Sequence, residues 1–177
     1  ERSYINLLRN NLVILDRDER RQMILESCKR LADSLNASFV RDEELVEHVT
    51  DLVEYPQAAL GNFSKDYLDL PEELLITVMR GHQKYFALRD GNGKLTDHFI
   101  IISNTRAENS ETVIKGAQKV LKARFEDARF YFQEDRKTPL IDRLETLKKV
   151  VYHERLGTIF DKVQSCLLYT SPSPRDS

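Results

Sequence analysis

Apolar residues recur at helical spacing near the start of the chain and predict its first long helix. Asp16 precedes this run, and Glu19 lies three residues later, where the acid of a capping box reaches back to the helix start. Asn36 is a plausible end. The apolar residues that share one face of the predicted helix are Ile24, Cys28, Leu31 and Leu35.

The next segment, up to about residue 106, mixes helical and extended patterns. Its predicted elements are a helix from about Glu43 to Val53, an extended run over Ala58–Phe63, a helix started by Pro71, a strand over Tyr85–Leu88 and a strand over His98–Ser103. Asp90–Gly93 is a strong turn signal, so the last two strands should form a β-hairpin. Gly81 could supply a left-handed exit from the Pro71 helix. Residues 1–106 are therefore predicted to be an α+β module.

Helical spacing dominates the remainder. A long helix is predicted from about Glu108, followed by one from Pro139 to Val151 and a last one from Thr158, so residues 107–164 should be an all-helical segment that is truncated. Residues 165–177, SCLLYTSPSPRDS, are rich in Ser and Pro and resemble sequencing-adapter read-through. We expect them to be a non-native tail.

Composition narrows the function classes. The 177 residues are 41% hydrophobic and 32% charged with a net charge of -2, which indicates a globular chain without an overall basic field. The two cysteines have no ligand or disulfide spacing, and the four histidines are scattered, so we expect no metal site. No apolar run approaches the roughly 20 residues of a membrane span. With neither initiator Met nor signal pattern, the sequence is expected to be a cytoplasmic piece of something longer.

A local basic patch could still bind RNA. Lys115, Lys119, Lys122 and Arg129 fall on one face of the long helix, and we call these four residues the cationic stripe. Such a stripe could lie along a phosphate backbone and release counterions. The alternative is a solvated face in which Glu126 pairs with Lys122.

RGHQKYFAL, at Arg80–Leu88, is a second candidate. Lys84 could meet a phosphate and Tyr85 could stack on a base. Hydrogen bonds from His82 and Gln83 could equally hold a helix-to-strand corner. Both interpretations stay open on the sequence.

An ATP site is not expected. Gly91–Lys94 lacks the first glycine of a P-loop and the Ser or Thr after its Lys. Arg41 and Glu43 carry the Arg-x-Glu of an ATP-binding strand, but Asp42 and the residues after it predict a helix start. We therefore assign no catalytic, cofactor-binding or metal-binding residue.

The run from about residue 11 to Gln164 resembles the β subunit of bacterial heterotetrameric glycyl-tRNA synthetase. The segments that carry the resemblance are LVEYP, HQKYF, KVLKARFEDARF and LGTIFDKV. One departure is Gly116-Ala117, where the family usually has Gly-Asn.

The resemblance implies a subunit of an α2β2 glycine–tRNA ligase. In that family the α subunit activates glycine with ATP and Mg²⁺, while the β subunit recognises and positions the tRNA for glycine. The resemblance further implies that residues 1–106 are similar to an editing-type module of phenylalanyl-tRNA synthetase and that 107–164 begin a helical domain.

Two alternatives remain open. The first is a stand-alone, non-catalytic RNA-binding or scaffolding module. The second is a hydrolase that edits mischarged tRNA, which follows from fold likeness alone and finds no nucleophile or metal set here.

Overall fold

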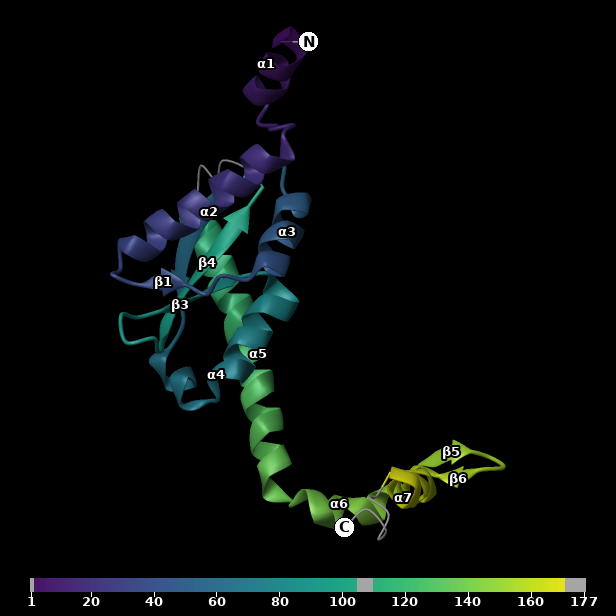
Figure 1. Ribbon diagram of the computed structural model, residues 1–177. Coiled ribbons are helices and arrows are strands. Elements are labelled where there is room, and N and C mark those ends of the chain that lie inside the picture. The colour runs from purple at the N-terminus through teal and green to yellow at the C-terminus, as the bar shows by residue number, and fades with distance from the viewer. Residues whose placement is uncertain (1, 105–109, 171–177) are drawn as a thin grey trace, which may run out of the picture. The chain divides into compact units, whose positions relative to one another are not determined.

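The computed structural model describes residues 2–104 and 110–170. The chain divides into two compact units, Glu1–Arg129 and Phe130–Ser177. We call them the first unit and the second unit, and each has its own arrangement of helices and strands (Figure 1).

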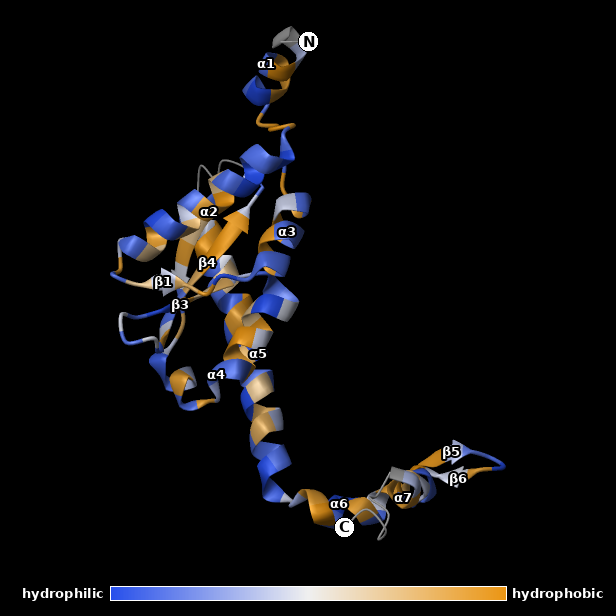
Figure 2. Cartoon of the chain, viewed as in Figure 1, coloured by the Kyte–Doolittle hydropathy of each residue, from blue (hydrophilic) through white to orange (hydrophobic). Residues whose placement is uncertain are grey.

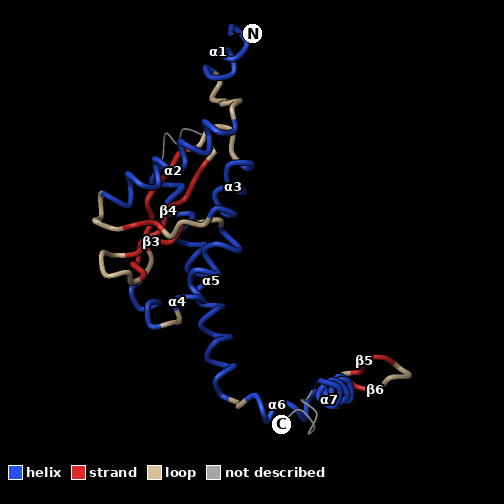
Figure 3. The backbone as a smooth tube through the Cα atoms, viewed as in Figure 1, coloured by secondary structure: helices blue, strands red, loops and turns tan. Residues whose placement is uncertain are grey.

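The first unit is built on a four-stranded antiparallel sheet (Figure 3). In spatial order its strands are β1 (Ser38–Phe39), β3 (Phe86–Arg89), β4 (Leu95–Ser103) and β2 (Gln57–Asn62). The predicted hairpin is confirmed as β3–β4. Its turn is held by the Asp90 carboxylate, which accepts hydrogen bonds from the Asn92 and Lys94 N–H groups at 2.8 and 2.9 Å.

Helices α2 (Arg17–Asp33) and α3 (Glu43–Leu52) cover one face of this sheet. The core between them includes Ile24, Cys28, Val46, Phe86, Leu88 and Ile100. Both helices were predicted and are confirmed, and Asp16 caps α2 by accepting from the Asp18 and Glu19 N–H groups. The capping-box expectation for Glu19 is wrong, because its side chain instead pairs with Arg9 of α1 (Arg2–Asn10) at 2.6 Å.

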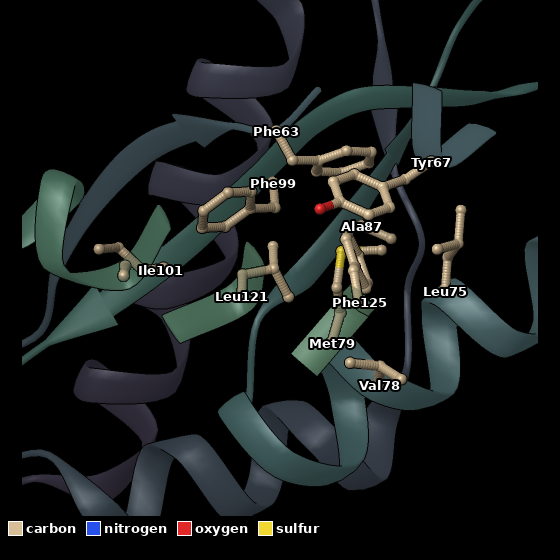
Figure 4. Packing of buried hydrophobic residues seen from close by; sticks show 11 residues of the cluster. Phe63, Tyr67, Leu75, Val78, Met79, Ala87, Phe99, Ile101, Leu121 and Phe125 are labelled. Carbon is tan, nitrogen blue, oxygen red and sulfur yellow. The ribbon is translucent and has the colours of Figure 1, made fainter. Parts of the chain in front are cut away.

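The opposite face is covered by α4 (Glu72–Val78), the short 3₁₀ helix η1 (Lys65–Asp69) and the first part of α5 (Ser110–Lys137). Figure 4 shows Phe63, Tyr67, Phe99 and Phe125 gathered in this second core. A π-helical turn, η2 (Met79–Gln83), ends α4. The start that we expected for α5, near Glu108, lies outside the described residues.

The second unit contains the end of α5, then α6 (Leu140–Leu147), β5 (Val151–His153), β6 (Gly157–Thr158) and α7 (Ile159–Thr170). The mixed α+β fold class is confirmed, but the expectation of helices alone after residue 106 is wrong. β-Branched and aromatic residues at 150–152 favour extended backbone, and Gly157 adopts a φ of 85°. The Asp161 carboxylate then accepts from the Thr158 N–H at 2.8 Å.

Two helices of the structure extend across the predicted domain limits at residues 106 and 164 or pack across them. The first part of α5 packs into the first unit through Ala117, Leu121 and Phe125, although we placed a boundary at 106. Helix α7 runs through Ser165 into the segment that we took for a non-native tail. The division at 106 and 164 stays a prediction. Figure 2, which is coloured by hydropathy, shows hydrophobic residues along β4 and the first part of α5, both of which contribute to the cores of the first unit.

We expect Gly61→Ala to destabilise the first unit by about 1–3 kcal/mol, because an ideal Cβ at Gly61 would lie 2.5 Å from the Phe99 ring. Gly116→Ala is the matched control, since Gly116 is helical with nothing within 4 Å of an added Cβ, and it should stabilise by about 0.5–1 kcal/mol. Denaturant unfolding measures both. Equal effects of the two substitutions would contradict this account of Gly61.

Candidate nucleic-acid interface

The cationic stripe lies on α5, and the buried side of that helix determines which way the stripe faces. Ala117, Leu121 and Phe125 repeat every four residues and are buried against the sheet. Lys119 and Lys122 lie on other faces of the helix and are exposed. Helical spacing also predicts Val113 and Val120 as core positions, but the structure leaves 39% and 44% of their surface exposed and buries Phe125, which that spacing did not indicate.

The lysines of the stripe differ in their partners. Lys115 forms an ion pair with Glu111 one turn away, at 2.7 Å, and both side chains are largely exposed. Lys119 and Lys122 have no ion pair within the described part of the chain. These two cations are therefore available to an anionic partner.

Arg129 does not share that exposure, because η1 engages it. Its guanidinium lies 4.4 Å from the centre of the Tyr67 ring and donates to the Asp66 carbonyl at 3.1 Å. The Tyr67 hydroxyl donates to the carboxylate of Glu126. Burial and this hydrogen bond raise the pKa of Tyr67 to about 12. Glu126 thus pairs with Tyr67, and not with Lys122 as the solvated-face alternative had it. Arg129 fastens η1 to α5.

A surface hollow borders the stripe on the side of η1. The residues that line it are Asn62, Phe63, Ser64, Tyr67, Gln118 and Lys122. The Gln118 amide nitrogen donates to the side-chain oxygen of Asn62, which ties α5 to the end of edge strand β2. Only Lys122 of this set was a predicted site residue. Asn62 and Gln118 carry no local sequence signal, since they are 56 residues apart and meet through the fold.

The HQKYF segment forms a corner between helix and strand. Lys84, rather than Gly81, takes the left-handed conformation, with a φ of 58°, so our expectation for Gly81 is wrong. The π turn displaces the helix end by several residues, and the Lys84 ammonium then donates to the Gly81 carbonyl at 3.0 Å. Within residues 2–104 and 110–170, the side chains of His82 and Gln83 make no hydrogen bond that would hold the corner.

Lys84 and Tyr85, the two residues of this segment that could contact RNA, both lie against other residues of the protein. Tyr85 is half-buried and its ring stacks on Phe99, with centroids 5.0 Å apart and planes 16° apart. Lys84 lines a separate hollow with Glu44, His48 and Arg80. That hollow shares no residue with the one beside the stripe. The six candidate residues therefore divide between two places on the first unit.

Other chemistry is limited in the part of the chain that is described. In residues 2–104 and 110–170, no three His, Cys, Asp or Glu side chains gather as metal ligands would. Burial raises the pKa of the Cys28 thiol to about 12, which keeps it protonated and unreactive. None of the described helices is both long and apolar enough to cross a bilayer.

Comparison with known proteins assigns the family. Residues 1–169 match the family described as glycyl-tRNA synthetase beta subunit, and the chain belongs to this family. It is 49% identical over 160 residues to the glycine--tRNA ligase beta subunit of Thermodesulfovibrio yellowstonii, covering 90% of this chain and 24% of the relative. The corresponding protein of Streptococcus agalactiae serotype III is 47% identical over 159 residues, covering 90% and 23%. The chain thus spans about a quarter of the length of these relatives.

We expect Lys84→Gly to leave the free energy of unfolding within about 1 kcal/mol of the wild type, because glycine tolerates a φ of 58° and offsets the lost Lys84–Gly81 hydrogen bond. Lys84→Ala keeps the strain and loses the bond, so it should be the less stable variant. If Lys84 also contacts RNA, both variants weaken tRNA binding and lower its salt slope by roughly one. Unchanged affinity in both would leave Lys84 a purely structural role.

Asp42 caps α3 and pairs with Arg80, and its ionisation makes the stability of the fold depend on pH. Burial opposes its ionisation, but the Leu45 N–H and the Arg80 guanidinium outweigh burial and lower its pKa. A lowered carboxylate pKa stabilises the fold above the unfolded value of about 3.9, and this contribution is lost as pH falls through the folded pKa.

Asp42→Ala should therefore cost about 1 kcal/mol near neutral pH through the lost N-cap. Asp42→Asn should cost less, because asparagine also caps α3. Unfolding measured from pH 7 down to pH 3 should show the difference between wild type and Asp42→Asn shrinking with acid. A constant difference would argue against the ionised Asp42 as its source.

Proposed function

We propose that this chain is part of the tRNA-recognising β subunit of a cytoplasmic glycine–tRNA ligase. Its family membership supports this, together with the names of relatives that are 47–49% identical. The reaction of the whole enzyme would be the ATP-dependent attachment of glycine to its tRNA. In this proposal the chain works with an α subunit in an α2β2 assembly.

The chemistry of glycine activation belongs to the other subunit in this proposal. ATP and Mg²⁺ would be held by the α subunit. The sequence of this chain offers no P-loop spacing and no Arg-x-Glu strand, and Arg41 instead pairs with Glu43 at the start of α3. The contribution of this segment would be to hold and orient the RNA.

The observation that carries the RNA role is the exposed part of the cationic stripe. Lys119 and Lys122 project from a helix that is fixed in the core by Ala117, Leu121 and Phe125, so the backbone positions of the two lysines are held at constant spacing. A rigid row of cations neutralises phosphates with little loss of backbone entropy. Arg129 supports the row indirectly, because it fastens η1 against the same helix.

The double substitution Lys119→Ala and Lys122→Ala, made in the full-length β chain with its α partner, tests the proposal. Two exposed contacts of about 0.7 kcal/mol each should together weaken tRNA binding about ten-fold. The slope of log K against log salt should fall by roughly two. Glycine charging should show a raised KM for tRNA with kcat nearly unchanged.

Lys29→Ala with Lys94→Ala is the matched control, since both lysines are exposed and neither lies on α5. It removes the same charge elsewhere in the first unit. If the stripe variant matches this control in affinity and slope, the stripe is only a solvated face. If the chain binds RNA but glycine charging of the tRNA proceeds equally well when the chain is absent, a stand-alone RNA-binding module becomes the better account.

A further inference from the structure

The hollow beside the stripe holds an amide pair with hydrogen-bonding capacity left over. One bond joins the Gln118 amide nitrogen to the Asn62 oxygen. The side-chain nitrogen of Asn62 and the side-chain oxygen of Gln118 make no hydrogen bond within residues 2–104 and 110–170. The pair therefore presents one donor and one acceptor next to each other.

Two aromatic side chains in the walls of this hollow are held in fixed positions. Phe63 and Tyr67 line it, are 8% and 3% exposed, and pack against Phe125 with ring centroids 5.0 and 5.2 Å away. Tyr67 is further held by Glu126 and Arg129. A site that is already ordered loses little entropy when a ligand enters.

The charges around the hollow favour a base inside it and a phosphate at its rim. Lys122 is the one cation among its lining residues. The Ser64 hydroxyl donates to the Asp66 carboxylate at 2.9 Å, so a negative charge lies close to the η1 side. That carboxylate would repel a phosphate placed inside. A neutral base carries a donor and an acceptor on adjacent atoms of its Watson–Crick edge, which matches the open groups of Asn62 and Gln118.

We propose that the hollow receives the base of one unpaired nucleotide of the RNA whose phosphates lie along Lys119 and Lys122. The inference rests on the proposed function and adds a specific contact to it. Asn62 and Gln118 hydrogen-bond the edge of the base, and Lys122 neutralises an adjoining phosphate. A base within a duplex cannot present this edge, so only an unstacked, unpaired nucleotide fits.

Asn62→Asp tests the donor. Aspartate keeps an oxygen for Gln118 and nearly the same shape, but it replaces the free donor by an acceptor. In the full-length β chain with its α partner, we expect a transcript of the tRNA for glycine to bind about ten-fold more weakly. The salt slope separates the two effects of this change: a slope equal to that of the wild type assigns the loss to the missing donor, and a lower slope assigns it to the new carboxylate beside Lys122 and counts against base readout.

Asn92→Asp is the matched control, because it makes the same change at an exposed position of the β3–β4 turn. Its effect on affinity should stay within about two-fold. If Asn62→Asp and Asn92→Asp have equal effects, the hollow does not read a base. If the lysine double variant weakens tRNA binding and Asn62→Asp does not, this inference fails and the proposed function stands. If neither variant weakens tRNA binding, both the inference and the proposed function are overturned.

A second measurement does not depend on the stability of the Asn62→Asp variant. A photo-cross-linking amino acid at position 62 should attach to a nucleotide that is unpaired in the folded tRNA. Cross-links confined to paired nucleotides, or none at all with bound tRNA, would overturn the proposal.

Discussion

The contact between the Phe99 ring and the Gly61 backbone is the constraint on which the first unit depends. The two residues are direct partners across β2 and β4, and a Cβ at Gly61 would lie 2.5 Å from the ring. Phe99 also stacks on Tyr85 at 5.0 Å and is paired with Ala87 of β3, so this residue contacts both neighbours of β4 and the segment that precedes β3. Because this pairing sets the register of β2, it also places Asn62, the next residue, beside Gln118 of α5.

Strand β4 explains why the unit has helices on both faces of its sheet. Phe99 and Ile101 point into the core beneath α4 and α5, while Ile100 and Ile102 point toward α2 and α3. A strand that is apolar on both sides must be covered on both sides. The result is a helical layer on each face, and α5 is held in position by the same core that contains Phe99.

The stripe shows that cations of one helix face can have different tasks. Lys119 and Lys122 are exposed without an ion pair in the described ranges, whereas Arg129 lies over Tyr67 and donates to the Asp66 carbonyl. Arginine suits the second task because its planar guanidinium can stack on a ring and donate at its edge together. Counting the charges on α5 does not separate these two roles. The position of η1 does, because η1 contacts Arg129 through Tyr67 and Asp66.

Local signals in the sequence determined the elements whose energetics are local. Asp16 and Asp42 cap the helices that follow them, and the Asp90–Gly93 turn forms the predicted hairpin, because each depends on side chains a few residues apart. The family motifs likewise lay in the sequence and needed no coordinates. The apolar pattern of α5 was less informative, since it did not separate Phe125 in the core from Val120 at the surface.

The tertiary structure alone decided the features that join distant segments. It made Tyr67 the partner of Glu126, ended α4 in a π turn with Lys84 left-handed, and placed the paired strands β5 and β6 between two helices, in a segment that we expected to be all-helical. It also brought Asn62 to Gln118 across 56 residues. These outcomes depend on packing and on satisfying buried hydrogen bonds between elements, which no local pattern encodes.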